Sequence, residues 1–452
     1  MNSTPNPAPV PESRWLIFLR SLVALVLALA LTVIAALTAF SLMLQHADDA
    51  VMKFDSSAVR GAVGVFILLV ILLPLITLFV AWRRRWISWR GLAVGWLLTL
   101  PVLFWLAWDE PTVRAPLTME ELSPRFAGDE QSYAVLMQYS KGQPSAAAKA
   151  FAADKLRANA YVGATTKDAA KWREAVLKRQ AEIEATWTAL EPERQWLTEL
   201  NAFDRIGDLT PAKYDANIMG FGVWRVLSQH ACATATLLAL DGRGGDAMDV
   251  LLPVLEVSRK LQPSARTLVR AMIAVSTERS LVETAAMVLD LTEVPQRERD
   301  RLTALLQPGL EAGGARRLML MEYVFFQPLI NSLKLGDALA LFRGSPKLVV
   351  RRSLNFLSGL FINPNATVNR YGDQIYTLAD LARARKLEQL SAQTKVFEKS
   401  LEHDGGIKNF GGRLMLATSL PSYDKILESY WTLQDERAAT LAKLKSKPVP
   451  VD

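Results

Sequence analysis

The chain has 452 residues, of which 50% are hydrophobic and 21% are charged. Its single cysteine excludes an internal disulfide scaffold and a thiolate zinc site built within this chain, and three histidines are too few for a histidine-rich metal centre. The net charge of +7 is divided between residues 1–114, which carry +3, and the remaining chain, which carries +4. This small excess of positive charge does not make the whole surface attractive to the phosphate backbone of a nucleic acid, so we expect no nucleic-acid partner.

Three long uncharged runs stand near the N-terminus, at residues 21–45, 61–82 and 91–108. A helix rises about 1.5 Å per residue, so each run comes close to or exceeds the roughly 30 Å of hydrocarbon in a bilayer. The first run is longer than the 7–15 residues of a signal-peptide core. The sequence therefore predicts three transmembrane helices; the alternative is that one of these segments is interfacial or is cleaved.

The orientation of these spans follows from a basic loop between the second and the third. Arg83, Arg84, Arg85 and Arg90 lie within eight residues there, and loops rich in Lys and Arg remain in the cytoplasm. The N-terminus is then cytoplasmic as well, and everything after Asp109 lies across the membrane. We expect a multi-pass protein of the plasma (inner) membrane with a periplasmic C-terminal domain if the cell is Gram-negative.

The predicted spans contain no Asp, Glu, Lys, Arg or His. Because ionisable groups inside a membrane mark ion paths and proton relays, their absence argues against a pump or an intramembrane protease formed by this chain alone. Gly91 and Gly95 form a GxxxG pair that permits close helix packing. That pair serves either the protein's own spans or an interface with a partner.

The fold class expected is all-α, with three transmembrane helices followed by a large α-helical domain built as a helical-hairpin array or an irregular bundle. Residues 1–14 form a Pro-rich tail predicted to be disordered, and residues 15–109 form the membrane anchor. A linker at 110–124 leads into a helical domain at 125–345, followed by a C-terminal helical subdomain at 346–452.

The helical domain follows from a 3.6-residue apolar spacing and from Gly and Pro breaks. Helices are expected over residues 146–161, 166–201 with a possible break near Pro192, 211–240, 246–261, 265–291, 296–306, 316–335, 347–361, 375–402 and 423–444. Residues 231–240 would place apolar side chains on nearly every face of a helix, as expected of a helix in the middle of a bundle.

One helix–turn–helix segment, residues 231–261 with the turn GRGGD, resembles a single tetratricopeptide-type hairpin. No second copy follows at a 34-residue period, and such stacks need about three repeats. The resemblance implies an α-hairpin architecture, which in repeat proteins presents protein-binding surfaces.

Two segments are candidates for recognition. Residues 363–372 (NPNATVNRYG) predict a loop in which Asn363, Asn365, Asn369 and Tyr371 could bind a ligand or partner; the alternative is a structural connection. Residues 347–362 predict a basic amphipathic helix, either an outer bundle helix or one lying on an anionic bilayer.

No catalytic, cofactor-binding or metal-ligating residue emerges from the motifs. Residues 120–125 satisfy EExxxR, which resembles a motif of CAAX-type membrane proteases, but the hexad contains Pro124 and lies in a linker with no intramembrane histidine to join it. There is no phosphate-binding loop, HExxH or GxSxG.

The leading functional expectation is a non-catalytic, membrane-anchored scaffold or protein-interaction protein of the cell envelope. Its partners would be the lipid bilayer and another envelope protein, with no cofactor and an open oligomeric state. The alternative is a membrane-anchored hydrolase or transferase with a dispersed acidic and arginine site. A third, a channel subunit, requires oligomerisation, because three apolar helices enclose no polar path.

Overall fold

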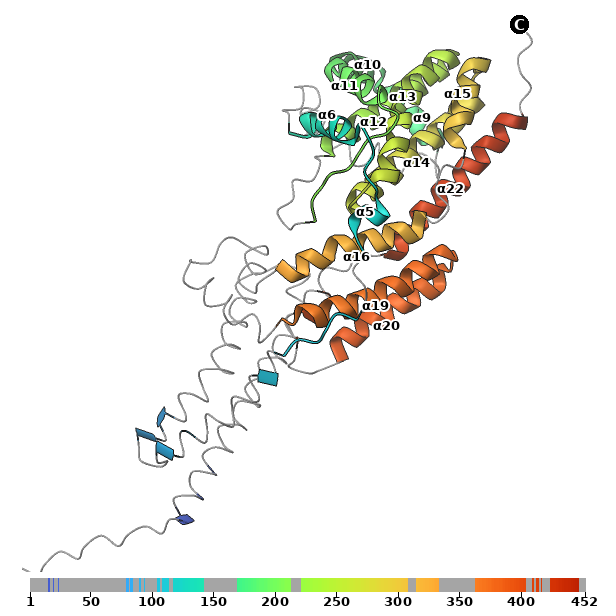
Figure 1. Ribbon diagram of the computed structural model, residues 1–452. Coiled ribbons are helices and arrows are strands. Elements are labelled where there is room, and N and C mark those ends of the chain that lie inside the picture. The colour runs from blue at the N-terminus through green and yellow to red at the C-terminus, as the bar shows by residue number, and fades with distance from the viewer. Residues whose placement is uncertain are drawn as a thin grey trace, which may run out of the picture. The chain divides into compact units, whose positions relative to one another are not determined.

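A computed structural model describes residues 108–113, 117–141, 169–212, 221–307, 314–332, 362–403 and 423–446, together with isolated positions before residue 108 and between 409 and 416 (Figure 1). Every secondary-structure element in these ranges is an α-helix, which confirms the all-α expectation. The chain divides into two compact units, and the described helices belong to the unit formed by Pro111–Ser332, Pro364–Gly405 and Arg413–Asp452.

The predicted membrane spans at 21–45, 61–82 and 91–108 lie almost entirely outside the described residues. Among the helices that are described, none combines the length and the apolar character needed to cross a bilayer. The helices expected at 146–161 and 347–361, and the boundary expected at residues 345/346, also lie outside the described ranges.

The described helices follow one another with short connections. They are α5 (Met119–Leu122), α6 (Asp129–Lys141), α9 (Ala169–Lys178), α10 (Gln180–Ala189), α11 (Glu191–Asn201), α12 (Gly222–Leu240), α13 (Gly244–Ser264), α14 (Leu268–Leu291), α15 (Gln296–Leu306), α16 (Gly314–Ser332), α19 (Pro364–Arg383), α20 (Leu387–His403) and α22 (Tyr423–Ser446).

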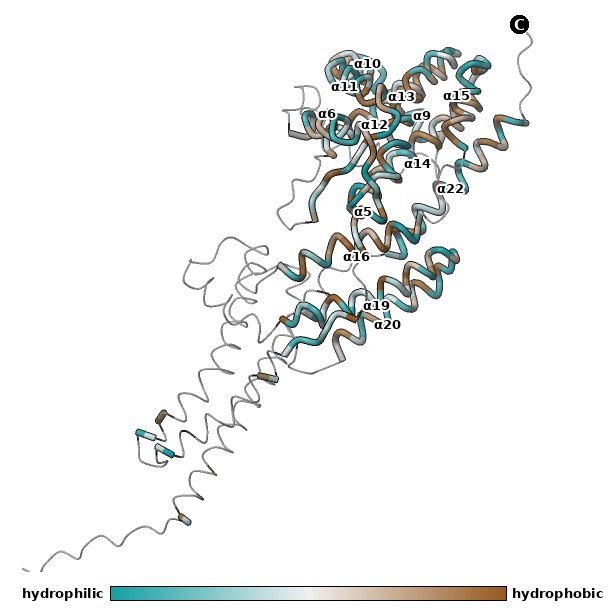
Figure 2. Tube along the Cα trace, in the orientation of Figure 1, coloured by the Kyte–Doolittle hydropathy of each residue, from teal (hydrophilic) through white to brown (hydrophobic). Residues whose placement is uncertain are grey.

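Helices α12, α13 and α14 pack on one another and form the centre of this unit, and α14 also packs against α16 and α22 (Figure 1). Residues Ala231 to Leu237 of α12 are all buried, which confirms the expectation of a helix surrounded by neighbours. The hydropathy colouring shows apolar stretches running through this central group (Figure 2). Burial of these apolar side chains is the main stabilising contribution to such a bundle.

The turn between α12 and α13 has the geometry that its glycines predict. Gly242 adopts a positive φ of 75°, and its N–H donates to the carbonyl of Ala239 at 3.1 Å while Arg243 N–H donates to Leu238 at 2.8 Å. Glycine takes this left-handed conformation without a steric penalty and so closes α12. The α-hairpin expected for residues 231–261 is therefore present.

The helix expected at 166–201 is three helices, α9, α10 and α11. Its predicted break near Pro192 occurs at Leu190, because proline lacks the N–H that would continue α10 but fits the first turn of α11. A further break at Arg179, between α9 and α10, was not predicted. Trp196 of α11 stacks edge-to-face on Trp224 of α12, with ring centroids 6.2 Å apart.

Other parts of the predicted helix pattern also need correction. The helix expected at 375–402 is divided into α19 and α20 by Arg385, which has a φ of 53° and lies just after the end of α19. Helix α6 was not predicted, because its polar sequence has only a weak apolar stripe. The linker expected at 110–124 contains the short helix α5, whose N-cap Thr118 forms a reciprocal capping box with Glu121.

The loop expected at 363–372 is also wrong, because Pro364 begins α19. Thr367, Val368, Tyr371 and Ile375 are buried at helical spacing and pack α19 onto α16. The asparagines and the proline predict a turn when read alone, but the apolar stripe beneath them outweighs that local preference.

Candidate functional site

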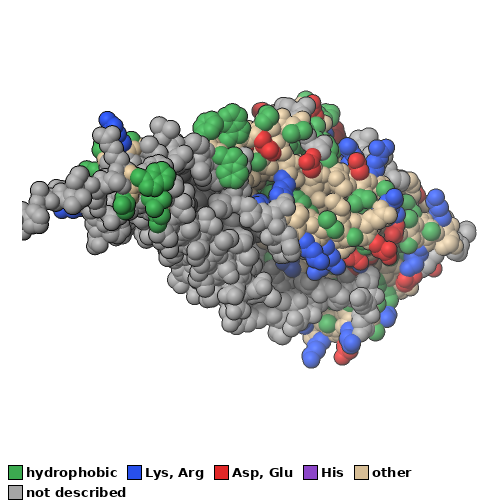
Figure 3. All heavy atoms as spheres, turned by 90° about the horizontal axis from the view of Figure 1, so that it is seen from below, with side chains coloured by type: hydrophobic (Ala, Val, Ile, Leu, Met, Phe, Trp, Pro, Cys, Tyr) green, Lys and Arg blue, Asp and Glu red, His purple; other side chains and the backbone are tan. Residues whose placement is uncertain are grey.

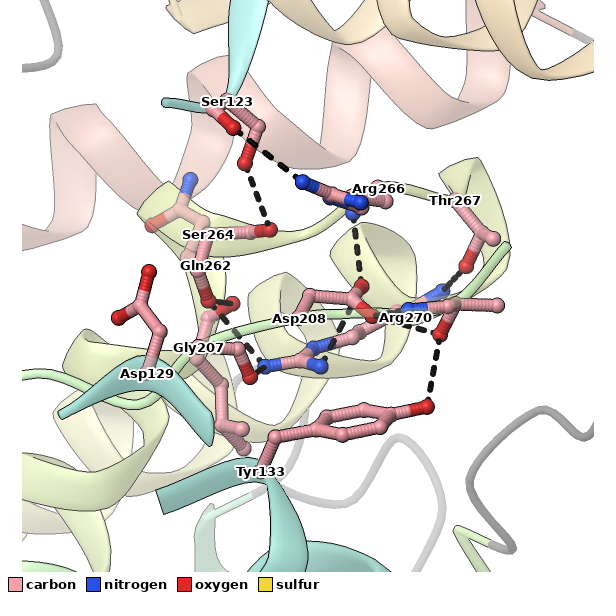
Figure 4. Close-up of polar contacts among 12 residues, drawn as sticks. Ser123, Asp129, Tyr133, Gly207, Asp208, Gln262, Ser264, Arg266, Thr267 and Arg270 are labelled. Carbon is pink, nitrogen blue, oxygen red and sulfur yellow. Dashed lines mark hydrogen bonds and ion pairs between the residues drawn. The ribbon is translucent and has the colours of Figure 1, made fainter. Parts of the chain in front are cut away.

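The most elaborate polar arrangement in the described chain surrounds the N-terminus of α14 (Figure 4). We call it the cap network and define it by Asp208, Arg266 and Arg270 with the groups that they contact. Asp208 and Arg270 form an ion pair of 3.3 Å, and their side chains are 0% and 2% exposed. Both charges have thus left water, which is tolerated only where each finds partners.

Both oxygens of the Asp208 carboxylate are satisfied. Oδ1 accepts from the Thr210 N–H at 3.0 Å and from the Thr210 hydroxyl at 2.6 Å, and Oδ2 accepts from the Arg266 N–H at 2.8 Å. Burial alone would raise the pKa of Asp208, but the charge of Arg270 and these hydrogen bonds hold it below its ordinary value. The carboxylate is therefore ionised and already engaged.

The arginines of the cap network bind backbone carbonyls from distant segments. Arg270 Nη2 donates to the carbonyl of Gly207 and to the hydroxyl of Ser264, each at 3.2 Å. Arg266 Nη2 reaches the carbonyl of Ser123 at 3.5 Å. These contacts join the segment after α5, the segment after α11 and the α13–α14 connection. The cap network therefore holds these three segments together, and its arginine donors bind groups of the protein itself.

A second polar group lies at the same end of α14. The backbone N–H of Leu268, the first residue of α14, favours the charged form of the Glu322 carboxyl group on α16 and acts to lower its pKa. The first N–H groups of a helix have no partner within the helix and favour a negative charge. Burial opposes that preference and is the larger influence, raising the pKa of Glu322 to about 7.

Two tyrosines complete this group, which we call the Glu322 cluster: Glu322, Tyr371 and Tyr423. The hydroxyls of Tyr371, on α19, and Tyr423, at the start of α22, are 2.9 Å apart, and both residues are buried. Burial raises the pKa of each phenol well above its ordinary value, and the nearby Glu322 charge adds to this. The phenols therefore stay protonated, and Glu322 is the group that titrates near neutrality.

The chemistry available to the Glu322 cluster is proton binding. A carboxyl group with a pKa near 7 has the value wanted in a general acid or base, but its neighbours are packed side chains of α14, α16, α19 and α22. Among the described residues, no group of three or more His, Cys, Asp or Glu could hold a metal ion.

The described chain also has an open groove of about 570 Å³ on α5 and α16. Its lining residues are uncharged, and most are apolar: Leu117, Thr118, Met119, Ala212, Val324, Gln327, Pro328 and Asn331. Pro328 lacks an N–H, so the carbonyl of Val324 has no intrahelical donor at this position. The groove thus combines apolar side chains with the amide groups of Gln327 and Asn331.

Elsewhere on the surface, basic and acidic side chains lie interspersed over the described part of the face in Figure 3. Of the predicted topology determinants, Arg83 and Arg90 are isolated described positions, whereas Arg84 and Arg85 lie outside the described residues, as do Gly91 and Gly95. The role predicted for these residues therefore stays a prediction.

The asparagines of the predicted recognition loop hold the protein's own chain. Asn369 accepts from the N–H of Val113 through Oδ1 and donates to the carbonyl of Pro111 through Nδ2, both at 2.9 Å. Asn363 donates from Nδ2 to the carbonyl of Trp108 at 2.8 Å, and its N–H donates to the Asn409 side chain at 2.8 Å.

The two remaining loop candidates differ from each other. Tyr371 belongs to the Glu322 cluster, and Asn365 is partly exposed in the first turn of α19. Because the other side chains are buried or engaged, this segment offers little free surface for a partner.

The sequence prediction missed Asp208, Arg270 and Glu322. Glu322 did carry a signal, because it is the only charge in the apolar stretch 318–326 (LMLMEYVFF), and a lone acid in a buried stripe is exceptional. Asp208 and Arg270 carried none, because they are 62 residues apart and meet only through the fold. The lone Cys232 is buried, and burial raises the pKa of its thiol to about 12, as expected of a structural cysteine.

Comparisons of the chain with protein-family models, with curated proteins and with solved structures give no match. The functional argument therefore stands on the residues and geometry of this chain.

The raised pKa of Glu322 predicts a pH-dependent stability with a definite sign. Between the ordinary value of 4.5 and the folded value of about 7, the folded state binds more protons than the unfolded state. Its stabilising effect is complete below pH 4.5 and is lost as the pH rises through 7. At about 1.4 kcal/mol per pKa unit, the difference of about 2.5 between these two pKa values corresponds to a loss on the order of 3–4 kcal/mol.

Glu322→Gln keeps an acceptor for Leu268 but cannot titrate. We expect the free energy of unfolding of this variant, relative to the unmodified chain, to rise by about 2 kcal/mol between pH 5 and pH 8, measured by urea denaturation in mild detergent. Taking the difference cancels the opposite contribution of His230, whose pKa burial lowers to about 4. Glu398→Gln, at an exposed position of α20, is the control. Parallel pH profiles for Glu322→Gln and the unmodified chain would refute the assignment.

Proposed function

We propose that the chain is a membrane-anchored α-helical protein whose large helical domain lies outside the cytoplasm and binds another protein of the cell envelope. The observation that carries the binding function is the groove on α5 and α16. None of the described residues lining it is titratable, so it offers apolar contact and hydrogen bonding but no acid, base or nucleophile.

The groove suits an apolar segment of a partner protein. Leu117, Met119 and Val324 supply apolar surface, and Gln327 and Asn331 supply amide groups at the polar positions of α16. Recognition sites of this kind are largely apolar, with a few polar groups that fix orientation. A charged segment would lose hydration there without gaining a counter-charge.

The alternative of a dispersed acidic and arginine site receives less support. The strongest acid–arginine arrangements that the structure describes are closed: Asp208 with Arg270, and Glu278 with Arg437, whose side chains are all at most 4% exposed. A catalytic group must contact a substrate, and these groups contact one another.

The membrane anchor and its orientation are part of the proposal and are supported by the sequence. The uncharged runs at 21–45, 61–82 and 91–108 and the arginines at 83–85 and 90 are the features on which the expected topology depends.

Site-specific crosslinking in native membranes tests the groove. A photoreactive benzoylphenylalanine at Gln327 or at the exposed Asn331 should give an adduct with one and the same protein. Pro328→Glu, which puts a charge at an exposed groove position, should reduce that adduct by on the order of tenfold. The same photoreactive residue at Val396, 60% exposed on α20, is the control. Equal adducts from Val396, or none from either groove position, would contradict the proposal.

Cysteine labelling tests the orientation. Because Cys232 is buried and its pKa is raised, it gives little background for a membrane-impermeant maleimide. We expect Ala438→Cys, at an exposed position of α22, to be labelled from outside intact cells and Trp86→Cys to react only after the cells are opened. The reverse pattern would place the helical domain in the cytoplasm.

A further inference from the structure

The contact between α14 and α22 is rich in charge, and most of its acids have their own base. Asp290 pairs with Lys443, and the buried Glu278 pairs with Arg437. Arg437 Nη2 also donates to the Gln262 side chain at 3.3 Å. Arg259 of α13 also lies 3.6 Å from Glu278, so each of these acids has at least one base of its own and none of them disfavours the contact of the two helices.

One place along this contact departs from the pattern. Glu283 of α14 and Glu436 of α22 share a single base, Arg279, whose Nε lies 3.0 Å from Glu283 Oε1 and 2.9 Å from Glu436 Oε1. The two carboxyl groups thus converge on one guanidinium, and two negative charges face one positive charge there unless one carboxyl group binds a proton. We call these three residues the acid clasp.

We propose that the acid clasp is a pH-sensitive joint, which holds the C-terminal helix α22 against α14 while Glu436 is protonated and loosens that contact when the proton is lost. With one proton, the two carboxyl groups and Arg279 sum to zero charge. Without it, two carboxylates face one guanidinium and repel each other.

The other described charges named along this contact are engaged with partners of their own. Of the remaining helices that pack against α22, α15 contributes Arg299, which donates to the carbonyl of Leu444, two turns from Glu436. On the side of α20, Arg385 pairs with Asp435. Along α14, Glu278 and Asp290 are engaged by Arg437 and Lys443.

The exposure of the acid clasp permits it to exchange protons without unfolding. The side chains of Arg279 and Glu436 are 33% and 20% exposed, whereas that of Glu283 is 4% exposed. Burial is the largest influence on the pKa of Glu436 and, with the charge and the hydrogen bond of Glu283, raises it to about 7. For an acid with a raised pKa, the stabilising effect is complete below its ordinary value and is lost as the pH rises through 7.

The direction of its pH dependence distinguishes the acid clasp from an ordinary surface ion pair. An exposed carboxylate–arginine pair keeps its charges, and therefore its strength, from about pH 5 to pH 9. The acid clasp instead weakens over the interval from about pH 6 to pH 8. Its response is local to α14 and α22, and it depends neither on the groove nor on a partner.

Hydrogen exchange of the full chain in mild detergent tests this inference. After correction for the intrinsic dependence of exchange on pH, protection of the α22 amides around residue 436 should fall between pH 6 and pH 8 by about tenfold more than that of α12, because the loss of stability through Glu322 lowers the protection of both helices. Glu436→Gln keeps a neutral hydrogen-bonding group and should remove this difference between α22 and α12. Glu428→Gln, at an exposed position of α22, should behave like the unmodified chain.

Glu283→Gln, on the opposite helix, provides a second variant if Glu436→Gln folds poorly, and it should remove the difference between α22 and α12 in the same way. The inference is overturned if α22 protection falls no more than that of α12 in the unmodified chain. It is equally overturned if the difference persists in both glutamine variants, which would assign it to another titrating group.

Discussion

The N-terminus of α14 is the constraint on which the helical domain depends. Asp208 and Arg270 are fully buried charges, and an isolated ion of this kind is strongly disfavoured in a protein interior. The fold meets that requirement by bringing the Thr210 side chain and the backbone of Gly207, Thr210 and Arg266 to them. A shift of α14 relative to these segments would leave at least one charge without a partner. The cap network therefore fixes the position of α14 relative to them.

The same helix end organises the neighbouring elements. Glu322 brings α16 to the first N–H of α14, and Tyr371 and Tyr423 connect α19 and the start of α22 to that cluster. At a later turn of α14, the acid clasp meets α22 again. Helix α14 thus has contacts of fixed charge, at Asp208, Glu278 and Asp290, and two contacts whose protonation changes near pH 7.

This distribution of polar groups bears on the proposed function. The ionisable side chains that could perform chemistry are directed into helix contacts, where they are engaged with one another. The groove on α5 and α16 has apolar and amide groups instead. The groove lining has no acid, base or nucleophile, and the buried charges contact one another, so the groove is better suited to holding a protein segment than to transforming a substrate.

The sequence predicted those features that depend on local pattern. It placed α15 at its observed bounds, the apolar helix at 231–240 and the glycine turn at Gly242, because each is determined by spacing or by a single residue's conformational preference. It failed where a long-range contact decided the outcome. Residues 363–372 have turn composition but become helical by packing on α16, and Arg385 divides a helix through a left-handed conformation that no composition rule assigns to arginine.

The candidate sites were harder still to predict from the sequence. Asp208 and Arg270 are ordinary polar residues until the fold places them together. The acid clasp likewise depends on two helices that are far apart in the chain, with 157 positions between Arg279 and Glu436. Only Glu322, alone in an apolar run, could have been recognised in advance. The membrane topology, by contrast, is a sequence property, and it remains a prediction about residues outside the described ranges.

The most direct test of this account is the energetic coupling between Asp208 and Arg270. A double-mutant cycle with Asp208→Ala, Arg270→Ala and the double variant, measured by urea unfolding of the full chain in detergent, isolates that coupling. We predict that each single variant loses about 3–5 kcal/mol and that the double variant loses little more than either one, a coupling of at least about 2 kcal/mol. Losses that simply add, with a coupling near zero, would contradict the view that this buried pair organises the domain.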